Sequence, residues 1–341
     1  MTFKIVNTAH QTGLDFGEGL LEAMDAELQS GLWFSEDELI EKAGDADAVI
    51  CAGPSQPWTR RVIESLSKCR ILASLSIGYD RIDLETAARQ CMVVTNVPDF
   101  CVEEVSCQSM ALIMALGRRL LHIDRVVREE QAHLSPPQRE ALARLAYPIF
   151  RMTEQTLGII GLGKIGTALA LKAKGVGLRV IAYDPYVFEG VMLSHGVEPV
   201  DLDTLLGTSD YISLNAALNE ETRNMINRDA LKKMKTTCYI VNTARGEIVD
   251  QPALVEALKA GEIAGAGLDA TVDEPLSPDN PLLEMSNVIL TGHSGWYSTT
   301  SDSSSGYWQK GMVQVITAIK GQWPLYAVNP QIKDRWLERW G

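Results

Sequence analysis

The stretch Thr156-Leu157-Gly158-Ile159-Ile160-Gly161-Leu162-Gly163-Lys164-Ile165-Gly166 decides how this chain is expected to fold. Its first five residues are apolar or β-branched, as in a strand that is buried on both faces. Gly161, Gly163 and Gly166 then form a GxGxxG turn that opens an apolar helical pattern. A strand, a glycine-rich turn and a helix in this order predict the first βαβ unit of a doubly wound parallel sheet.

The three glycines suit the phosphate end of a dinucleotide. One makes the tight turn, one lets backbone N–H groups approach a pyrophosphate, and one lets the helix pack closely on the strand. The helix N-terminus at Lys164 and Ile165 adds partial positive charge for the anion. The next strand ends at Asp184, 18 residues beyond Gly166, where a carboxylate accepts hydrogen bonds from the adenosine ribose and disfavours a 2′-phosphate. The pattern favours NAD over NADP, and a purely structural glycine turn is the alternative.

Apolar, strand-like runs recur along the chain in two series. The runs are Phe3–Asn7, Ala48–Ala52, Ile71–Leu75 and Met92–Thr95, then Thr156–Ile160, Leu178–Tyr183, Tyr211–Leu214, Cys238–Asn242, Ala264–Leu268 and Val288–Leu290. Helical stretches such as Gly19–Gln29 and Ser35–Ala43 alternate with them. This alternation predicts parallel sheets, and the strands are too many for one ordinary sheet. We therefore expect an α/β chain with two doubly wound parallel-sheet domains: a Rossmann cofactor domain and a discontinuous, flavodoxin-like substrate domain.

The domain boundaries follow from the residues between and after the two series. A helical pattern runs from Val102 to about Arg128, and a polar segment from Gln131 to Thr156 follows it. A last helix is expected from about Tyr307 to Lys320 and can return to the first domain. We predict a substrate domain of residues 1–100 and 297–341, and a cofactor domain of residues 101–296.

The composition argues against several classes of protein. The chain has 341 residues, of which 46% are hydrophobic and 22% charged, as in globular proteins. Its net charge of −13 argues against a nucleic-acid or anionic-membrane binder. The N-terminus lacks a signal-peptide pattern, and no apolar run approaches the roughly 18 residues of a membrane span. The six cysteines form no CxxC pair and the histidines are scattered, so we expect reduced thiols in a cytoplasmic protein without a metal site.

Three later segments place polar side chains just after predicted strands. Arg245, Glu274 and His293 follow the last three runs of the second series. In an open parallel sheet, ligands bind outside the carboxyl ends of the strands. We therefore expect these three side chains to face the cofactor site.

These three residue types suit the reduction of a 2-keto acid. A guanidinium such as that of Arg245 donates two parallel hydrogen bonds to a carboxylate. An imidazole such as that of His293 titrates near neutrality and can protonate a developing alkoxide. A carboxylate such as Glu274 orients the imidazolium and stabilises its charge. Taken singly, the three could instead be a surface cation, a solvated loop acid and a structural histidine.

The combined motifs resemble the D-isomer-specific 2-hydroxyacid dehydrogenase family. They are GLGKIG with Asp184, NTARG around Arg245, the glutamate before Pro275 and the late histidine. The resemblance extends from the Ile77-Gly78-Tyr79-Asp80 turn to the last helix. It implies an NAD-dependent oxidoreductase that interconverts a 2-keto acid and a D-2-hydroxy acid, with Arg245, Glu274 and His293 as catalytic residues and His293 as the acid/base. It also implies a homodimer, formed through the cofactor domains by a helix and arm at about residues 102–156.

The resemblance implies further contacts. Ile77 and Gly78 would present backbone amides to the substrate carboxylate beside Arg245. Asp269 would reach the nicotinamide carboxamide. The other implied cofactor contacts, besides the glycine turn and Asp184, are Val105, Ala216, Ala217, Thr222, Thr243, Ala244 and Gly295.

Two positions depart from the family pattern, and one segment points to a branch of the family. Asn215 stands where a histidine is common, and Gly292 stands where a proline is common before the catalytic histidine. The segment around Trp296 is most similar to the C-terminal-binding-protein branch, in which a tryptophan lines the substrate pocket and favours a bulky apolar side chain. A tryptophan that only packs is the alternative for Trp296. The alternative function is an NAD(H)-sensing scaffold of that branch with little turnover.

Overall fold

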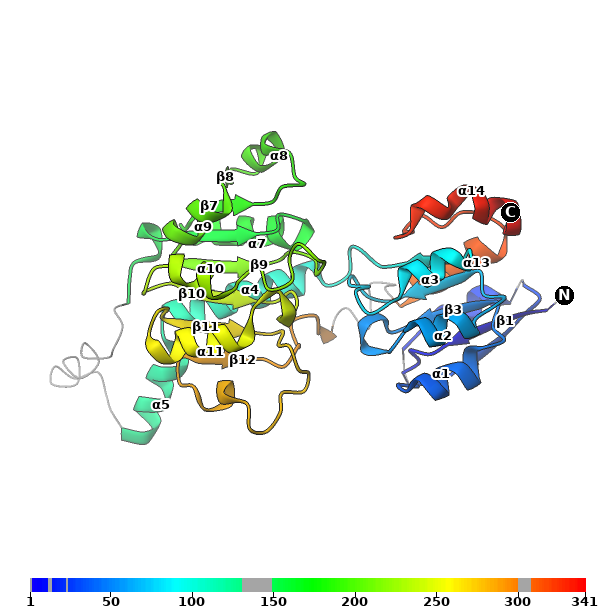
Figure 1. Cartoon of the computed structure of the whole chain (residues 1–341), viewed down its shortest axis with the longest axis horizontal. Helices are drawn as coiled ribbons and strands as arrows, with labels where there is room; N and C mark the ends of the chain where they lie inside the picture. The colour runs from blue at the N-terminus through cyan, green and yellow to red at the C-terminus, as the bar shows by residue number, and fades with distance from the viewer. Residues whose placement is uncertain (1, 12–13, 23, 131–148, 300–307) are drawn as a thin grey trace. The chain divides into compact units, whose positions relative to one another are not determined.

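The structure is a computed structural model that describes residues 2–11, 14–22, 24–130, 149–299 and 308–341. The chain divides into two compact units (Figure 1). Unit 1 comprises Met1–Phe100 and Ser298–Gly341, and unit 2 comprises Cys101–Tyr297. Most of the predicted arm at 131–156, and part of the segment before the last predicted helix, lie outside the described residues.

Unit 1 contains a five-stranded sheet in which every strand pair is parallel. Its strands are β1 (Phe3–Asn7), β2 (Ala26–Ser30), β3 (Ala48–Cys51), β4 (Ile71–Ser74) and β5 (Val93–Thr95). The spatial order β2-β1-β3-β4-β5 is that of flavodoxin-like sheets. The helix predicted over Gly19–Gln29 is wrong, because these residues form a short 3-10 turn and β2. Burial in β2 alternates weakly, as suits an edge strand, so the sequence pattern did not distinguish it from an amphipathic helix.

The helices of unit 1 cover both faces of this sheet. They are α1 (Glu36–Ala43), α2 (Arg60–Ser65), α3 (Leu84–Arg89), α13 (Gln309–Ile319) and α14 (Lys333–Trp340), with 3-10 turns at Glu18–Leu21, Gly53–Ser55 and Pro330–Ile332. The start of α1 follows from its sequence, because Ser35 accepts a hydrogen bond from Glu38 N at 3.3 Å while Glu38 Oε2 accepts one from Ser35 N at 3.1 Å.

The C-terminal segment completes the core of unit 1. Trp336 of α14 is fully buried, and its indole N–H donates to Arg70 O at 2.9 Å. The buried Asn329 side chain accepts from Val94 N at 3.0 Å and donates to Met92 O at 3.0 Å. The C-terminal segment is thus bound to β5 and to the residues just before β4 and β5, more than 200 residues earlier in the sequence.

Unit 2 contains a seven-stranded sheet that is also parallel in every pair. Its strands are β6 (Thr156–Ile160), β7 (Arg179–Tyr183), β8 (Glu198–Pro199), β9 (Tyr211–Leu214), β10 (Tyr239–Asn242), β11 (Gly265–Leu268) and β12 (Val288–Leu290). The order β12-β11-β10-β9-β6-β7-β8 is that of a Rossmann sheet with one further strand. The predicted fold class, two doubly wound parallel sheets, is confirmed.

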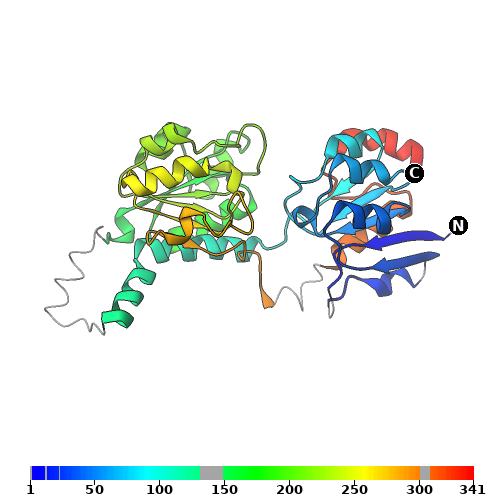
Figure 2. The same ribbon diagram turned by 60° about the horizontal axis from the view of Figure 1, so that its bottom comes forward.

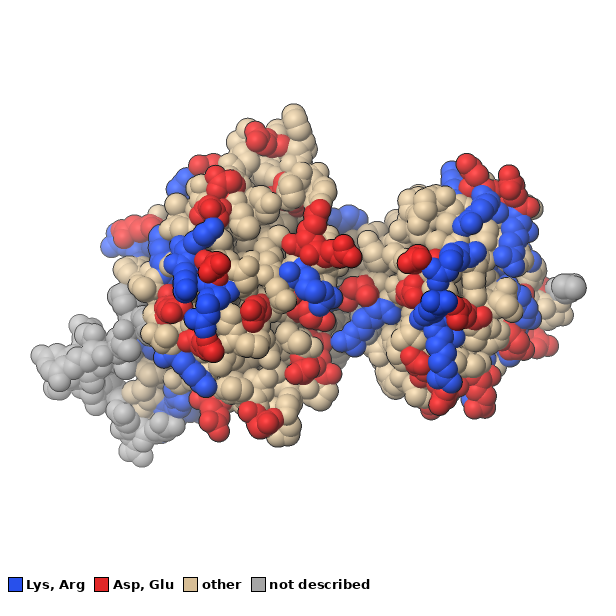
Figure 3. Space-filling view, in the orientation of Figure 1, with Lys and Arg blue, Asp and Glu red and all other residues tan. Residues whose placement is uncertain are grey.

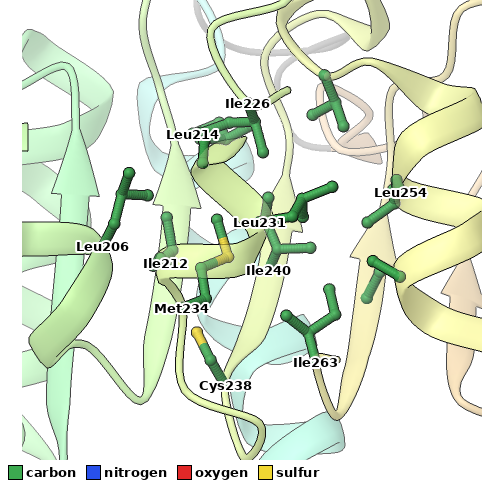
Figure 4. Close-up of a cluster of buried hydrophobic side chains, with 14 of the residues drawn as sticks. Leu206, Ile212, Leu214, Ile226, Leu231, Met234, Cys238, Ile240, Leu254 and Ile263 are labelled. Atoms are coloured by element: carbon green, nitrogen blue, oxygen red, sulfur yellow. The ribbon is translucent and has the colours of Figure 1, made fainter. Parts of the chain in front are cut away.

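Helices lie on both faces of the unit 2 sheet (Figure 2). They are α4 (Val102–Gly117), α7 (Lys164–Gly175), α8 (Glu189–Ser194), α9 (Leu202–Thr208), α10 (Arg228–Lys233) and α11 (Gln251–Ala260), with 3-10 turns at Met152–Glu154, Gly246–Ile248 and Pro281–Glu284. Helix α5 (Leu120–Glu130) follows α4 and projects from the unit (Figure 1). Side chains of α9, α10 and α11 pack on one face in the cluster shown in Figure 4, which includes Leu206, Leu231 and Leu254. Helices α4 and α7 cover the other face.

The prediction of one helix from Val102 to Arg128 is wrong in its continuity. The chain turns at Arg119, whose φ is +54°, so that α4 and α5 are separate helices. Gly117 ends α4 where a Cβ would lie 2.2 Å from the Tyr211 hydroxyl. The apolar spacing continues through this break, which is why the pattern alone did not show it.

The described surface carries charges of both signs. Figure 3 shows basic and acidic side chains interspersed over the face in view of each unit. Many are paired across neighbouring elements, as in Arg61 with Asp37 at 2.6 Å and Arg179 with Glu198 at 2.6 Å. Within the described residues, no helix has both the length and the apolar character needed to cross a membrane.

We expect Trp336→Ala to lower the free energy of unfolding by about 3–5 kcal/mol, because it empties a large buried volume and removes one of the two hydrogen bonds to Arg70 O, which keeps Val93 N as its other donor. Denaturant unfolding followed by circular dichroism measures the change. Leu337→Ala is the matched control, since Leu337 is 37% exposed on the same helix, and its effect should stay below about 1 kcal/mol. Equal effects of the two substitutions would contradict the role given to α14.

Candidate active site

The register of the unit 2 sheet brings six strand ends into one row. Leu290, Leu268, Asn242, Leu214, Ile160 and Tyr183 are aligned across neighbouring strands. The residues that follow them are Thr291, Asp269, Thr243, Asn215, Gly161 and Asp184. All the loops that carry the predicted site of unit 2 therefore begin at the same edge of the sheet.

The glycine turn has the geometry that a dinucleotide requires. Gly161 has φ +90°, and a Cβ there would lie 2.6 Å from Ala216 N. At Gly166 a Cβ would lie 2.2 Å from Gly161 O, whereas the space around Gly163 is open. Gly163 is the N-cap of α7 and has no side chain to cap the first N–H groups of that helix. These donors and the open space fit a pyrophosphate.

Asp184 braces the glycine turn from the next strand. Its Oδ2 accepts from Leu162 N at 2.8 Å, and its Oδ1 accepts from Tyr186 N at 2.9 Å. A carboxylate oxygen has two lone pairs, so each oxygen can accept a further hydrogen bond. Asp184 is therefore suited both to hold the turn and to bind ribose hydroxyls.

Of the remaining predicted cofactor contacts, Ala216 lies against the glycine turn at Gly161. Thr222 closes the loop after β9, because its Oγ1 donates to Ala217 O at 2.7 Å and accepts from Asn219 N at 2.8 Å. Sequence reasoning missed Ser109 on α4, whose hydroxyl bonds to Val105 O at 2.9 Å and to Thr243 Oγ1 at 2.7 Å. Ser109 is one of two serines in this helix, and nothing in the sequence distinguished it.

A buried asparagine positions the loop of Arg245. Asn242 donates to Arg245 O at 2.8 Å and accepts from Ala244 N at 3.0 Å. The next residue, Gly246, approaches the following loop so closely that a Cβ would lie 2.1 Å from the Thr271 carbonyl carbon. Asn242 begins the NTARG motif, and its position at the end of a buried strand was the signal in the sequence for this role.

Glu274 and His293 form a hydrogen-bonded pair. Glu274 Oε2 lies 2.7 Å from His293 Nδ1, and Glu274 Oε1 accepts from Thr271 N at 3.1 Å. Burial by itself raises the pKa of Glu274, but the hydrogen bond and charge of His293, the Thr271 amide and the charge of Arg245 outweigh it and bring the pKa below its ordinary value. Glu274 is therefore ionised at neutral pH and accepts from the imidazole, while Nε2 is left for another partner.

The loop after β12, Thr291–Trp296, carries His293 and is called the histidine loop. It folds around the buried side chain of Asp269. The Asp269 carboxylate accepts from Thr291 Oγ1 at 2.5 Å, Ser294 N at 3.0 Å and Gly295 N at 3.1 Å. His293 N donates to Asp269 O at 2.7 Å. At Gly295 a Cβ would lie 2.7 Å from Asp269 Oδ2. Asp269 thus braces the loop of the predicted acid/base, and its contact with a carboxamide stays a prediction.

The backbone of the histidine loop is left-handed at two consecutive residues. Gly292 and His293 both have φ +58°. A proline ring holds φ near −65°, so the proline common at position 292 in the family could not adopt this backbone. Glycine suits this position, since it adopts a positive φ without strain.

The predicted substrate residues are divided between the two units. Ile77 and Gly78 follow β4 in unit 1, where Asn96 Nδ2 donates to Ile77 O at 2.8 Å and Ser76 Oγ donates to Gly78 O at 2.5 Å. Trp296 is half-buried at the end of the histidine loop in unit 2, with its ring edge-on to Tyr297 at 5.8 Å. Their roles toward a substrate stay predictions.

Comparisons with known proteins agree with this geometry. Residues 110–295 match the family model described as D-isomer specific 2-hydroxyacid dehydrogenase, NAD binding domain. The chain is 39% identical over 298 residues to a glyoxylate reductase of Korarchaeum cryptofilum, and the matched region covers 87% of each of the two chains.

Two solved structures are also similar over nearly their whole length. The D-lactate dehydrogenase of Aquifex aeolicus, complexed with NAD and lactic acid, has a TM-score of 0.79 and 27% identity over 96% of this chain and 99% of that chain. An acyclic imino acid reductase in complex with NADPH and D-Arg has a TM-score of 0.80 and 27% identity over 96% and 100%. The NAD-binding assignment is confirmed by the family model, whereas the branch within the family stays a prediction. The chain belongs to the family of D-isomer specific 2-hydroxyacid dehydrogenases.

Proposed function

We propose that the protein is an NAD-dependent enzyme that reduces a 2-keto acid to a D-2-hydroxy acid, and catalyses the reverse reaction. The observation that carries this proposal is the 2.7 Å Glu274–His293 pair, placed at the same sheet edge as an open glycine turn. The hydride that reduces the keto carbon would come from NADH bound at this turn. The glycine turn with Lys164, Asp184 and the Thr222 loop would hold this cofactor.

The side chains of unit 2 supply what the cofactor lacks. Arg245 would hold the substrate carboxylate through two N–H groups, which orients the keto carbon. His293 would donate a proton from Nε2 to the keto oxygen as the hydroxyl forms, because its Nδ1 is bonded to Glu274. Ionised Glu274 stabilises the imidazolium and fixes its orientation.

We assign unit 2 to the cofactor and unit 1, with Ile77 and Gly78, to the substrate. Trp296 is our candidate for selecting the substrate side chain.

We further propose that the protein is a cytoplasmic homodimer. The apolar surface of α5 supports the dimer, because Leu120, Leu121 and Val127 are 53%, 58% and 39% exposed there. Sedimentation equilibrium of the purified chain measures the oligomeric state.

The test is the decay of NADH absorbance with a panel of 2-keto acids. We expect sustained turnover, which His293→Ala lowers by about 10²–10⁴-fold while the Kd for NADH stays within about twofold. His195→Ala, which removes a histidine at the end of α8, is the control and should leave the rate unchanged. NADH binding without turnover on any keto acid would favour the NAD(H)-sensing scaffold instead.

Glu274→Gln tests the role of the carboxylate through the pH profile. Because the pKa of Glu274 is lowered in the folded protein, its charge supports the imidazolium throughout the neutral range and is lost only as pH falls through that lowered value. Removing the charge should lower kcat for keto acid reduction about 10-fold at neutral pH, and should abolish the loss of rate on the acid side that protonation of Glu274 causes in the wild type. Asp273→Asn, in the same loop, is the control. Superimposable profiles for Glu274→Gln and the wild type would refute the role.

Arg245→Lys tests the bidentate hold on the substrate. A lysine keeps the charge but cannot make two parallel hydrogen bonds. We expect kcat/KM for the keto acid to fall about 10- to 100-fold, with NADH binding unaffected. Arg223→Lys, at an exposed position of the same unit, controls for the exchange itself. Near-normal kcat/KM in Arg245→Lys would rule out the bidentate hold.

A further inference from the structure

Tyr186 connects the two turns that border the adenosine end of the glycine turn. Its backbone N–H donates to Asp184 Oδ1 at 2.9 Å, in the turn after β7. Its hydroxyl donates to Glu221 Oε2, in the turn after β9. Because β7 and β9 flank β6 in the sheet, this side chain spans the strand end that carries the glycines.

The backbone of Glu221 is fixed independently of this contact. Asn219 Oδ1 accepts from Glu221 N at 2.9 Å and from Thr222 N at 2.9 Å. Thr222 in turn closes the same turn through Ala217 O. The hydrogen bond from Tyr186 then holds the Glu221 carboxylate toward the Asp184 turn. The same hydrogen bond raises the pKa of the Tyr186 hydroxyl, and the negative charges of Glu221 and Asp184 raise it further.

We propose that Glu221, held by Tyr186, is a second residue that selects NADH over NADPH, in addition to Asp184. The inference rests on the proposed function, since it requires that the glycine turn binds NAD. Asp184 disfavours a 2′-phosphate through direct contact with the ribose. Glu221 would act through its charge alone, at longer range.

The electrostatic reason is the charge of the extra phosphate. A phosphate monoester carries about −1.5 to −2 charges at pH 7. A fixed carboxylate within about 8 Å of it disfavours binding by about fivefold in a water-exposed setting. NADH has an uncharged hydroxyl at this position, so the same carboxylate should have little effect on its binding. The similar imino acid reductase structure contains NADPH, and the similar D-lactate dehydrogenase structure contains NAD. The fold therefore accommodates either cofactor, and side chains must decide between them.

The test uses the full chain and compares equilibrium Kd values for NADH and NADPH. Glu221→Gln keeps an acceptor for Tyr186 and removes the charge, so we expect the Kd for NADPH to fall about fivefold and that for NADH to change less than twofold. The gain should shrink in 0.5 M salt, where the Debye length is only about 4 Å. Tyr186→Phe keeps the charge but frees the carboxylate, and should give a smaller change in the same direction.

Glu220→Gln is the matched control, because it removes the same charge from the neighbouring residue, whose side chain makes no hydrogen bond or ion pair within the part of the chain described. An unchanged NADPH-to-NADH ratio in Glu221→Gln, with NADH bound normally, would overturn this inference alone. An equal effect of Glu220→Gln would also overturn it, since net charge would then suffice. Failure of the wild type to bind NADH would overturn the proposed function and this inference together.

Discussion

The hydrogen-bonded register of the unit 2 sheet is the constraint on which the candidate site depends. Parallel pairing aligns Ile160 with Tyr183 and Leu214, and continues through Asn242 to Leu268 and Leu290. Parallel strands all present their carboxyl ends at one edge, so their loops meet there. A slip of one residue in any pair would turn the buried side chains of that strand to the opposite face. The apolar packing on both faces therefore maintains the positions of the site loops.

Buried polar groups convert this alignment into a defined arrangement of side chains. The Asn242 side chain forms hydrogen bonds with backbone groups of the loop that carries Arg245. The Asp269 carboxylate accepts hydrogen bonds from the loop that carries His293. A buried carboxylate is costly unless it is hydrogen-bonded, and Asp269 accepts three such bonds from one loop. Left-handed backbone at a residue other than glycine also costs free energy. The bonds to Asp269 offset that cost and hold His293 where its Nδ1 reaches Glu274.

The sequence predicted the elements with strong local signals and missed those with weak ones. Runs of buried β-branched residues, such as Thr156–Ile160, correspond to strands within a residue or two of the observed ends. The short edge strands β2 and β8 were missed, since an edge strand is not buried on both faces and β8 has only two residues. The break at Arg119 was missed because helical spacing resumes directly after it. Trp336 offered no sign in the sequence that it would be buried against strands far earlier in the chain.

The sequence by itself determined the fold class, the dinucleotide turn and the residue types of the candidate site, because each is encoded within a few neighbouring residues. Tertiary structure alone decided which of these residues meet. Glu274 reaches His293 across 19 positions, Gly246 packs against Thr271, and Tyr186 reaches Glu221 across 35 positions. Such contacts depend on the order and register of strands, which arise from packing the whole sheet. The number of residues between two positions therefore does not give the distance between their side chains, which the packing of the whole sheet decides.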